Sequence, residues 1–210
     1  GVRRHHIFPL VAMCLCEPCL YFLFESAALV HTAASQAAMI TTMLPLMVAL
    51  AAGLVFGERV SVRTVSGFVV AVAGAVWLSL AGGASGQAPN PALGNFFEFL
   101  AMVCATAYTI LMKQLSKTFH PFLLTGLQAF SGALFFAPAL LLPKVRAVAD
   151  LPVGGLLAVL YLGTVVSVGA YGLYNFGISR LPASQAAAVV NLIPVFSILL
   201  GYLIIGERMT

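Results

Sequence analysis

ASQAAMITTMLPLMVALAAGLVFGER, residues 34–59, occurs a second time in this chain as ASQAAAVVNLIPVFSILLGYLIIGER, residues 183–208. At a constant offset of 149 residues, the two stretches share Ala-Ser-Gln-Ala-Ala, a proline at matching positions and a closing Gly-Glu-Arg. Unrelated apolar helices share leucine and alanine by composition, but not a glutamine, a mid-helix proline and a terminal Gly-Glu-Arg in one register. The sequence therefore predicts a duplicated fold.

The composition indicates that the chain lies in a lipid bilayer. Hydrophobic residues make up 61% of its 210 residues, charged residues make up 8%, and the mean hydropathy is +1.06. This composition leaves too few polar residues to cover a water-soluble surface. The net charge of +4 is then a signal of orientation in the membrane, and no nucleic-acid partner is expected.

We expect an all-α polytopic membrane protein with seven transmembrane helices, because the chain has seven apolar stretches of spanning length. The segment GGASGQAPNP, residues 82–91, is the most loop-like part of the chain. It divides a first repeat unit, residues 1–82, from a second, residues 92–210, with residues 83–91 as the connecting loop. The predicted spans are residues 7–30, 34–56, 62–80, 93–115, 122–142, 154–178 and 183–205.

The offset of 149 residues predicts helices that this chain does not contain. Applied backward from residue 92, the offset leaves room for two helices before Gly1, and applied forward from residues 62–80, it places one helix after Thr210. We therefore expect a chain that corresponds to helices three to nine of a ten-helix protein. An odd number of helices in each repeat makes the second repeat enter the membrane in the opposite sense.

The charges of the loops predict which end of the bundle faces the cytoplasm. If residue 1 is cytoplasmic, seven basic residues lie inside and three lie outside, in agreement with the positive-inside rule. The inner group is Arg3, Arg4, Arg59, Arg63, Lys113, Lys117 and Arg180, and the outer group is Lys144, Arg146 and Arg208.

The motifs of the chain resemble those of one transporter family. The paired ASQAA helices, the A-x-x-Y-x-x-x-x-K pattern of Ala105, Tyr108 and Lys113, and Asn175 followed by residues 180–183 are similar to the EamA-like branch of the drug/metabolite transporter superfamily. The resemblance implies a ten-helix inner-membrane permease that opens a central cavity alternately to each side. Members export or exchange amino acids, their derivatives, sugars, nucleotide conjugates and drugs. Glu17-Pro18 and Glu25 depart from the family, where these positions are more often neutral or aromatic.

Two glutamates within the first span are candidates for proton or ion coupling. A carboxylate at membrane depth costs roughly 2.5 kcal/mol or more, so it normally faces a cavity or the interior of a bundle. Glu17 and Glu25 are about 80° apart around a helix and can line one wall. A structural hydrogen bond to a neighbouring helix is the alternative for both. Glu98 is interpreted as a residue of the membrane interface.

Polar residues that precede two prolines are candidates for substrate binding. Thr41, Thr42 and Asn191 fall near the middle of their predicted spans, and Thr42 and Asn191 are equivalent under the offset. Transporters with inverted repeats bind substrates at such places, although hydrogen bonding between helices is the alternative. Pro45 and Pro194 are also equivalent, and they are predicted to be either hinges of the two central helices or static kinks.

A group of tyrosines completes the predicted substrate site. Tyr171, Tyr174 and Asn175 share one helical face by their spacing, and Tyr108 lies on another span. These side chains would stack against a planar or apolar substrate, whereas tyrosine at a membrane interface serves as an anchor. The four cysteines lie in apolar runs, and Cys14 and Cys16 diverge by about 200° on a helix, so neither a metal site nor a cofactor is expected.

The functional prediction is a transporter that exports small metabolites, either coupled to protons through Glu17 or acting as a facilitator or exchanger. A seven-helix receptor is the alternative that fits the number of spans, but a receptor has no reason to repeat itself at 149 residues. An enzyme is not expected, because no nucleophile with a base lies at membrane depth. Small residues on the third span, Gly67, Ala71 and Gly74, would suit a homodimer.

Overall fold

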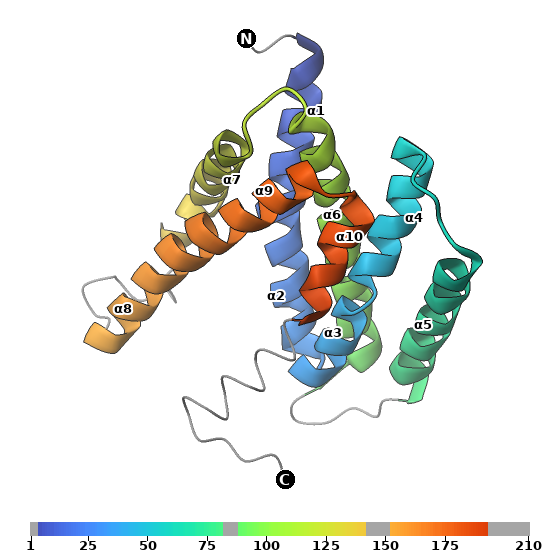
Figure 1. Ribbon diagram of the computed structural model, residues 1–210. Coiled ribbons are helices and arrows are strands. Elements are labelled where there is room, and N and C mark those ends of the chain that lie inside the picture. The colour runs from blue at the N-terminus through green and yellow to red at the C-terminus, as the bar shows by residue number, and fades with distance from the viewer. Residues whose placement is uncertain (1–3, 82–87, 142–151, 193–210) are drawn as a thin grey trace.

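The computed structural model describes residues 4–81, 88–141 and 152–192, and its regular elements are helices (Figure 1). Within these ranges, five helices are long and apolar enough to cross a membrane, and Val62–Trp77 is a shorter apolar helix. They agree with the first six predicted spans, and the seventh, 183–205, lies mostly outside the described residues. The five are Arg4–His31, Gln36–Phe56, Pro91–Leu115, Pro121–Leu141 and Val153–Arg180.

The first span is bent in the middle. It consists of α1 (Arg4–Cys14), a π-helical turn (Leu15–Leu20) and α2 (Tyr21–His31). Glu17 has the extended backbone angles φ −146° and ψ 123°, and a cis peptide bond joins it to Pro18. Because proline has no N–H and its ring collides with the preceding turn, the helix cannot continue unbroken through Pro18. The bend carries the Glu17 side chain into the protein, where it is 6% exposed.

The first duplicated stretch forms a broken helix. The helix α3 (Ala34–Thr41) ends at a turn of Thr42 and Met43, and α4 (Leu44–Phe56) begins there with Pro45 in its first turn. In the second copy, α10 (Ala183–Ala188) passes into a 3₁₀ segment, Val189–Leu192. Both copies therefore leave the α-helical conformation shortly before the proline of the motif.

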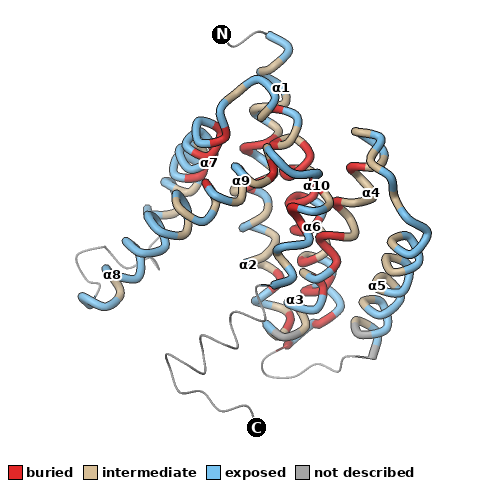
Figure 2. Tube along the Cα trace, viewed as in Figure 1, coloured by how far each residue is buried: buried red, intermediate tan, exposed pale blue. Residues whose placement is uncertain are grey.

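The helix α6 (Pro91–Leu115) is the central element. It packs against α1, α2, α3, α4, α9 and α10, and Figure 2 shows buried residues concentrated along it. The Asn90 side chain accepts a hydrogen bond from the Leu93 N–H, and Pro91 occupies the first turn, so the start of α6 is capped. The helix α5 (Val62–Ala81) lies at one edge of the bundle (Figure 1).

Two further spans lie on the other side of α6 (Figure 1). The first consists of α7 (Pro121–Phe136) and its 3₁₀ extension (Ala137–Leu141). The second consists of α8 (Val153–Tyr161), a π-helical part (Leu162–Ala170) and α9 (Tyr171–Arg180). The end formed by α8 is exposed in this structure, as Figure 2 shows. Gly132 brings α7 close to the bend of the first span, because a Cβ there would lie 2.5 Å from the Pro18 Cγ.

Hydrogen bonds join the end of the first copy of the duplicated stretch to the start of the second. Glu58 follows the end of α4, and its carboxylate accepts hydrogen bonds from the Ala183 N–H (3.0 Å) and the Ser184 hydroxyl (2.7 Å) at the start of α10. The beginning of the second copy therefore lies against the end of the first. An inverted repeat would bring these two ends together, and the inversion itself stays a prediction.

Basic residues gather at the same end of the bundle. The Lys113 ammonium group donates to the Leu181 carbonyl oxygen (2.6 Å), and Lys117 lies 5.3 Å from the centre of the Phe56 ring. The His6 ring packs edge-on against Phe119. The start of α1 and the ends of α4, α6 and α9 therefore share one end. That this end faces the cytoplasm stays a prediction.

Candidate functional site

A cavity of about 660 Å³ lies among the spans and is lined by both duplicated stretches. Thr41 and Leu44 come from the first copy, and Ala186, Val189 and Val190 come from the second. Most of the remaining wall is apolar. Its polar side chains are Glu17, Tyr21, Thr41, Thr109, Tyr171 and Tyr174. The cavity has the size and the sparse polar groups of a site for a small molecule.

Glu17 supplies a carboxyl group to the cavity wall. It lies at the bend of the first span, and the Tyr171 hydroxyl is its hydrogen-bonding partner. Within the described parts of the chain, no basic side chain forms an ion pair with Glu17. A carboxyl group in this position is costly to charge unless a proton, a cation or water reaches it. Glu17 therefore lines the cavity in this structure, and its role in coupling stays a prediction.

Glu25 does not line the cavity itself but is hydrogen-bonded to Tyr21, which does. It is half-buried and accepts a hydrogen bond of 2.9 Å from the Tyr21 hydroxyl, one turn earlier on α2. Tyr21 itself lines the cavity. Sequence analysis did not single out Tyr21, although its i, i+4 spacing from Glu25 was a visible signal.

Thr41 and Thr42 point to different places. Thr41 lines the cavity, whereas Thr42 is exposed, donates to the Met39 carbonyl oxygen (2.6 Å) and lines a separate hollow beside α5. Asn191 is also exposed, in the 3₁₀ segment of the second copy. Of the three predicted midplane ligands, the structure therefore brings only Thr41 to the cavity. Pro45 is buried in the first turn of α4, and Pro194 lies outside the described residues.

The predicted tyrosine group divides into two parts. Tyr171 and Tyr174 line the cavity. Tyr108 and Asn175 do not line it, and they belong instead to a buried network with α7: the Tyr108 hydroxyl lies 2.7 Å from Gln128 Oε1 and 2.8 Å from Asn175 Oδ1. The Asn175 amide in turn donates to the Thr125 hydroxyl (2.9 Å). This network joins α6, α7 and α9 behind the cavity wall.

Glu98 is a buried carboxyl group that sequence analysis placed at the membrane interface. The structure places it inside the bundle, where it is 1% exposed. The Thr41 hydroxyl lies 3.0 Å from its Oε1 atom, and its Oε2 atom has no hydrogen-bonding partner. The signal in the sequence was a carboxylate in an apolar helix, which normally faces a bundle interior.

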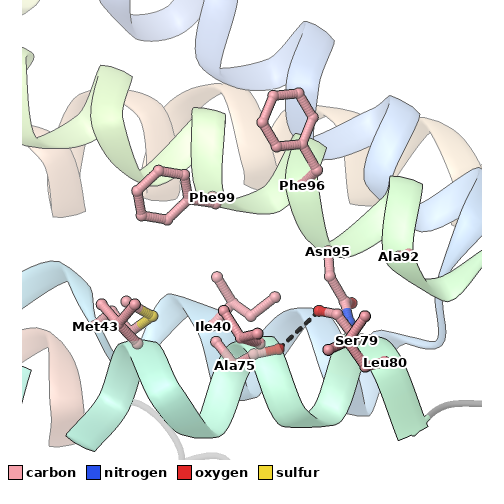
Figure 3. Close-up of a pocket in the computed structure, with 11 residues that line it drawn as sticks. Ile40, Met43, Ala75, Ser79, Leu80, Ala92, Asn95, Phe96 and Phe99 are labelled. Atoms are coloured by element: carbon pink, nitrogen blue, oxygen red, sulfur yellow. Dashed lines mark hydrogen bonds between the residues drawn. The ribbon is translucent and has the colours of Figure 1, made fainter. Parts of the chain in front are cut away.

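A second hollow, of about 310 Å³, lies between α5 and the central helices (Figure 3). Phe96 and Phe99 of α6 line one side, and the Asn95 amide donates to the Ser79 hydroxyl (3.0 Å) across it. The Asn95 side chain also bonds to Thr32 and to Gln36. These bonds attach the edge helix α5 to α6 and to the start of the first duplicated stretch.

Comparisons with known proteins agree with this architecture. The model of the EamA-like transporter family matches residues 2–80 and 92–210. The chain is 25% identical to the uncharacterized transporter YetK of Bacillus subtilis (strain 168), over 84% of this chain and 54% of the relative. It is also 25% identical to a probable terminal-alkyne amino-acid exporter of Streptantibioticus cattleyicolor, over 99% of this chain and 69% of the relative.

A plant relative, the chloroplastic WAT1-related protein At3g02690 of Arabidopsis thaliana, is 26% identical over 88% of this chain and 46% of its own length. The chain thus spans about half to two thirds of the length of these relatives. No solved structure matches it. The family consists of transporters, which favours transport over the receptor alternative and over an enzyme. With its duplicated helices, membrane composition and family match, this chain belongs to the EamA-like transporter family.

Proposed function

We propose that the full-length protein is a secondary-active or facilitative transporter that exports small metabolites by alternating access between two inverted five-helix repeats. This chain supplies helices three to nine of that protein, divided at residues 83–91. The proposal places the protein in a bacterial inner membrane, with residue 1 in the cytoplasm. The observation that carries it is the cavity of about 660 Å³ between the two duplicated stretches.

The breaks in the duplicated helices support alternating access. The helix α3 ends at Thr41, beside the cavity, and α10 gives way to a 3₁₀ segment at Val189, also shortly before the proline of its copy. Discontinuous helices at a repeat interface are typical of secondary transporters, because the half-helices can change their angle around a bound solute. We propose that Pro45 and Pro194 act as the hinges of this motion.

The chemistry of the cavity supports amino acids, their derivatives or similar amine-bearing drugs as substrates. Glu17 is suited to receive an ammonium group, and the hydroxyl groups of Thr41, Tyr171 and Tyr174 are suited to hydrogen bonding with a polar head group. The apolar remainder of the wall would accept an aliphatic or aromatic side chain. The similarity to a protein named as a probable amino-acid exporter supports the same class. Thr42, Asn191, Tyr108 and Asn175 remain proposed contacts of other stages of the cycle.

We propose that Glu17 and Glu25 take part in coupling transport to protons. Glu17 lies on the cavity wall, and Glu25 is hydrogen-bonded to Tyr21 on the same wall. A carboxyl group that must be neutral in an apolar surrounding and can be charged in water responds to the side on which the cavity opens. Proton release on one side and uptake on the other would then accompany each turnover.

The test uses full-length protein in liposomes and measures exchange of radiolabelled L-leucine and L-phenylalanine against unlabelled amino acid. Thr41→Val should raise the KM for the transported amino acid, because it removes a hydroxyl group from the cavity. Thr164→Val is the matched control: both hydroxyl groups bond to the carbonyl oxygen four residues earlier, but Thr164 is exposed and lies outside the cavity lining.

Glu17→Gln should abolish the dependence of amino-acid accumulation on an imposed pH gradient. If accumulation by the unmodified protein does not depend on the pH gradient, the proton-coupled mechanism is wrong, and the protein is a facilitator or an exchanger. Equal effects of Thr41→Val and Thr164→Val on the KM would show that this cavity is not the substrate site.

A further inference from the structure

Glu98 occupies an unusual place for a carboxyl group. It lies on α6, the most enclosed helix of the structure, and it is 1% exposed. Its Oε1 atom lies 3.0 Å from the Thr41 hydroxyl, and its Oε2 atom has no hydrogen-bonding partner. Burying a polar atom without a partner costs free energy, and burying a charge costs far more. A proton on the carboxyl group removes the charge.

The groups around Glu98 do not balance a charge there. The helices α1, α2, α3 and α4 pack against α6. Among the residues that the structure describes, the titratable groups Glu25 and Tyr21, both on α2, interact with Glu98, and Glu25 would repel a negative charge. In the parts of the chain that the structure describes, no basic side chain pairs with Glu98. A hydrogen ion is also the one cation that needs no coordination space, and Glu98 lines none of the three cavities.

Thr41 connects Glu98 to the cavity. Its hydroxyl lies 3.1 Å from the Ala37 carbonyl oxygen and 3.0 Å from Glu98 Oε1, but it has only one proton to donate. If Glu98 is ionised, the Thr41 hydroxyl donates to the carboxylate and leaves the Ala37 carbonyl. If Glu98 is protonated, the carboxyl O–H can donate to the Thr41 oxygen, and the hydroxyl returns to Ala37.

These two hydrogen-bonding arrangements lie at the break between α3 and α4. Thr41 is the last residue of α3, next to the break before α4, and Ala37 is one turn earlier on the same helix. A change of partner therefore alters the last turn of a half-helix that lines the cavity. Half-helix ends of this kind bind coupling ions in other secondary transporters.

We propose that Glu98 binds and releases a proton in each transport cycle, and that Thr41 transmits its protonation state to the cavity. The Glu98 carboxyl O–H passes its proton to the Thr41 oxygen, and the Thr41 hydroxyl, which lines the cavity, releases its own proton to water there, so that Glu98 becomes a carboxylate. The reverse transfer from water on the other side restores the carboxyl group. This inference rests on the proposed transport function and adds Glu98 to the coupling residues Glu17 and Glu25.

Infrared difference spectra test the proton site without any substrate. Full-length protein in lipid is exchanged between acidic and alkaline buffer, and the carbonyl stretching band of protonated carboxyl groups is recorded. Glu98→Gln should remove one component of the band, and Thr41→Val should move the same component to higher frequency because its hydrogen bond is lost. Glu58→Gln, whose carboxylate bonds to the start of α10 and not to Glu98 or Thr41, should leave that component in place.

Two outcomes would overturn the proposal. One is an unchanged band in folded Glu98→Gln protein. The other is an unchanged band frequency in Thr41→Val, and this result decides the question if Glu98→Gln does not fold. As a transport measurement, Glu98→Gln should retain exchange of labelled for unlabelled L-leucine at equal pH and lose accumulation driven by a pH gradient. If the unmodified protein moves no amino acid, the proposed substrate class fails, but the infrared spectra still decide the proton site.

Discussion

The contact between Glu58 and the start of α10 predicts an energetic link between the two copies of the duplicated stretch. The Glu58 carboxylate accepts hydrogen bonds from the Ala183 N–H (3.0 Å) and the Ser184 hydroxyl (2.7 Å), which lie 125 and 126 residues later in the sequence. Both donors belong to the first turn of a helix, where N–H groups lack partners within the helix. A negative charge is also favourable at this end of the helix dipole.

The perturbation is Glu58→Gln, which keeps the length of the side chain but removes its charge and one acceptor oxygen. Helix-capping bonds contribute about 0.5–2 kcal/mol, and hydrogen bonds to a charged group about 1.5–3 kcal/mol. Because Glu58 is only partly buried, we expect a loss near the lower end, about 1–2 kcal/mol. A loss of this size changes the folded-to-unfolded ratio by a factor of about 5 to 30.

A double-mutant cycle isolates the contact. Unfolding of the full-length protein in mixed micelles is measured for Glu58→Gln, Ser184→Ala and the double variant. We expect a coupling energy of about 0.5–1 kcal/mol, because each substitution removes the same hydrogen bond. The control cycle pairs Glu58→Gln with Ser26→Ala, whose hydroxyl bonds within its own helix to Leu23, and it should be additive.

Additive effects of Glu58→Gln and Ser184→Ala, within about 0.3 kcal/mol, would refute the link. The duplication extends the test to the second Gly-Glu-Arg. The offset of 149 residues pairs Glu58 with Glu207, which lies outside the described residues, and Ser184 with Ser35. From the sequence, we predict a coupling of similar size in the Glu207→Gln, Ser35→Ala cycle.

Two further predictions concern packing and buried polar groups. Gly132→Ala should lower the free energy of unfolding by about 1–3 kcal/mol, because its Cβ would lie 2.5 Å from the Pro18 Cγ; Gly126→Ala on the same helix, with nothing within 4 Å, should cost nothing, and equal melting temperatures of the two variants would contradict the close approach. Asn175→Ala should destabilise by about 1–3 kcal/mol, more than Tyr108→Phe, because it removes a partner from both the Tyr108 and the Thr125 hydroxyl groups. Denaturant unfolding of both variants measures the difference, and the reverse order would contradict the network.

The predictions from sequence were most accurate where the signal is local. Apolar stretches of spanning length located six spans, and the described part of the seventh begins at Ala183, as expected. The bend at Pro18 and the left-handed Gly57 at the end of α4 follow from the backbone chemistry of proline and glycine. The duplication also predicts that the two copies run in opposite directions, and this stays a prediction.

The assignment of side chains to the cavity was less accurate. Spacing on a helix groups Tyr171, Tyr174 and Asn175 on one face, but only the two tyrosines line the cavity, while Asn175 turns toward Tyr108 and α7. Thr41 and Thr42 are equally polar and adjacent, yet only Thr41 lines the cavity. Periodicity gives the relative angle of two residues on one helix, but not the rotation of that helix against its neighbours.

By itself, the sequence determined that the protein lies in a membrane, that it contains a duplicated unit and which segments are long and apolar enough to cross the bilayer. These properties depend on hydropathy, length and backbone chemistry within one segment at a time. Only the tertiary structure decided that Glu98 is hydrogen-bonded to Thr41 and that Glu58 caps α10. It also decided that Glu17 and Tyr171 line the same cavity. Each of these contacts joins segments far apart in the sequence, so each depends on how whole helices pack against one another.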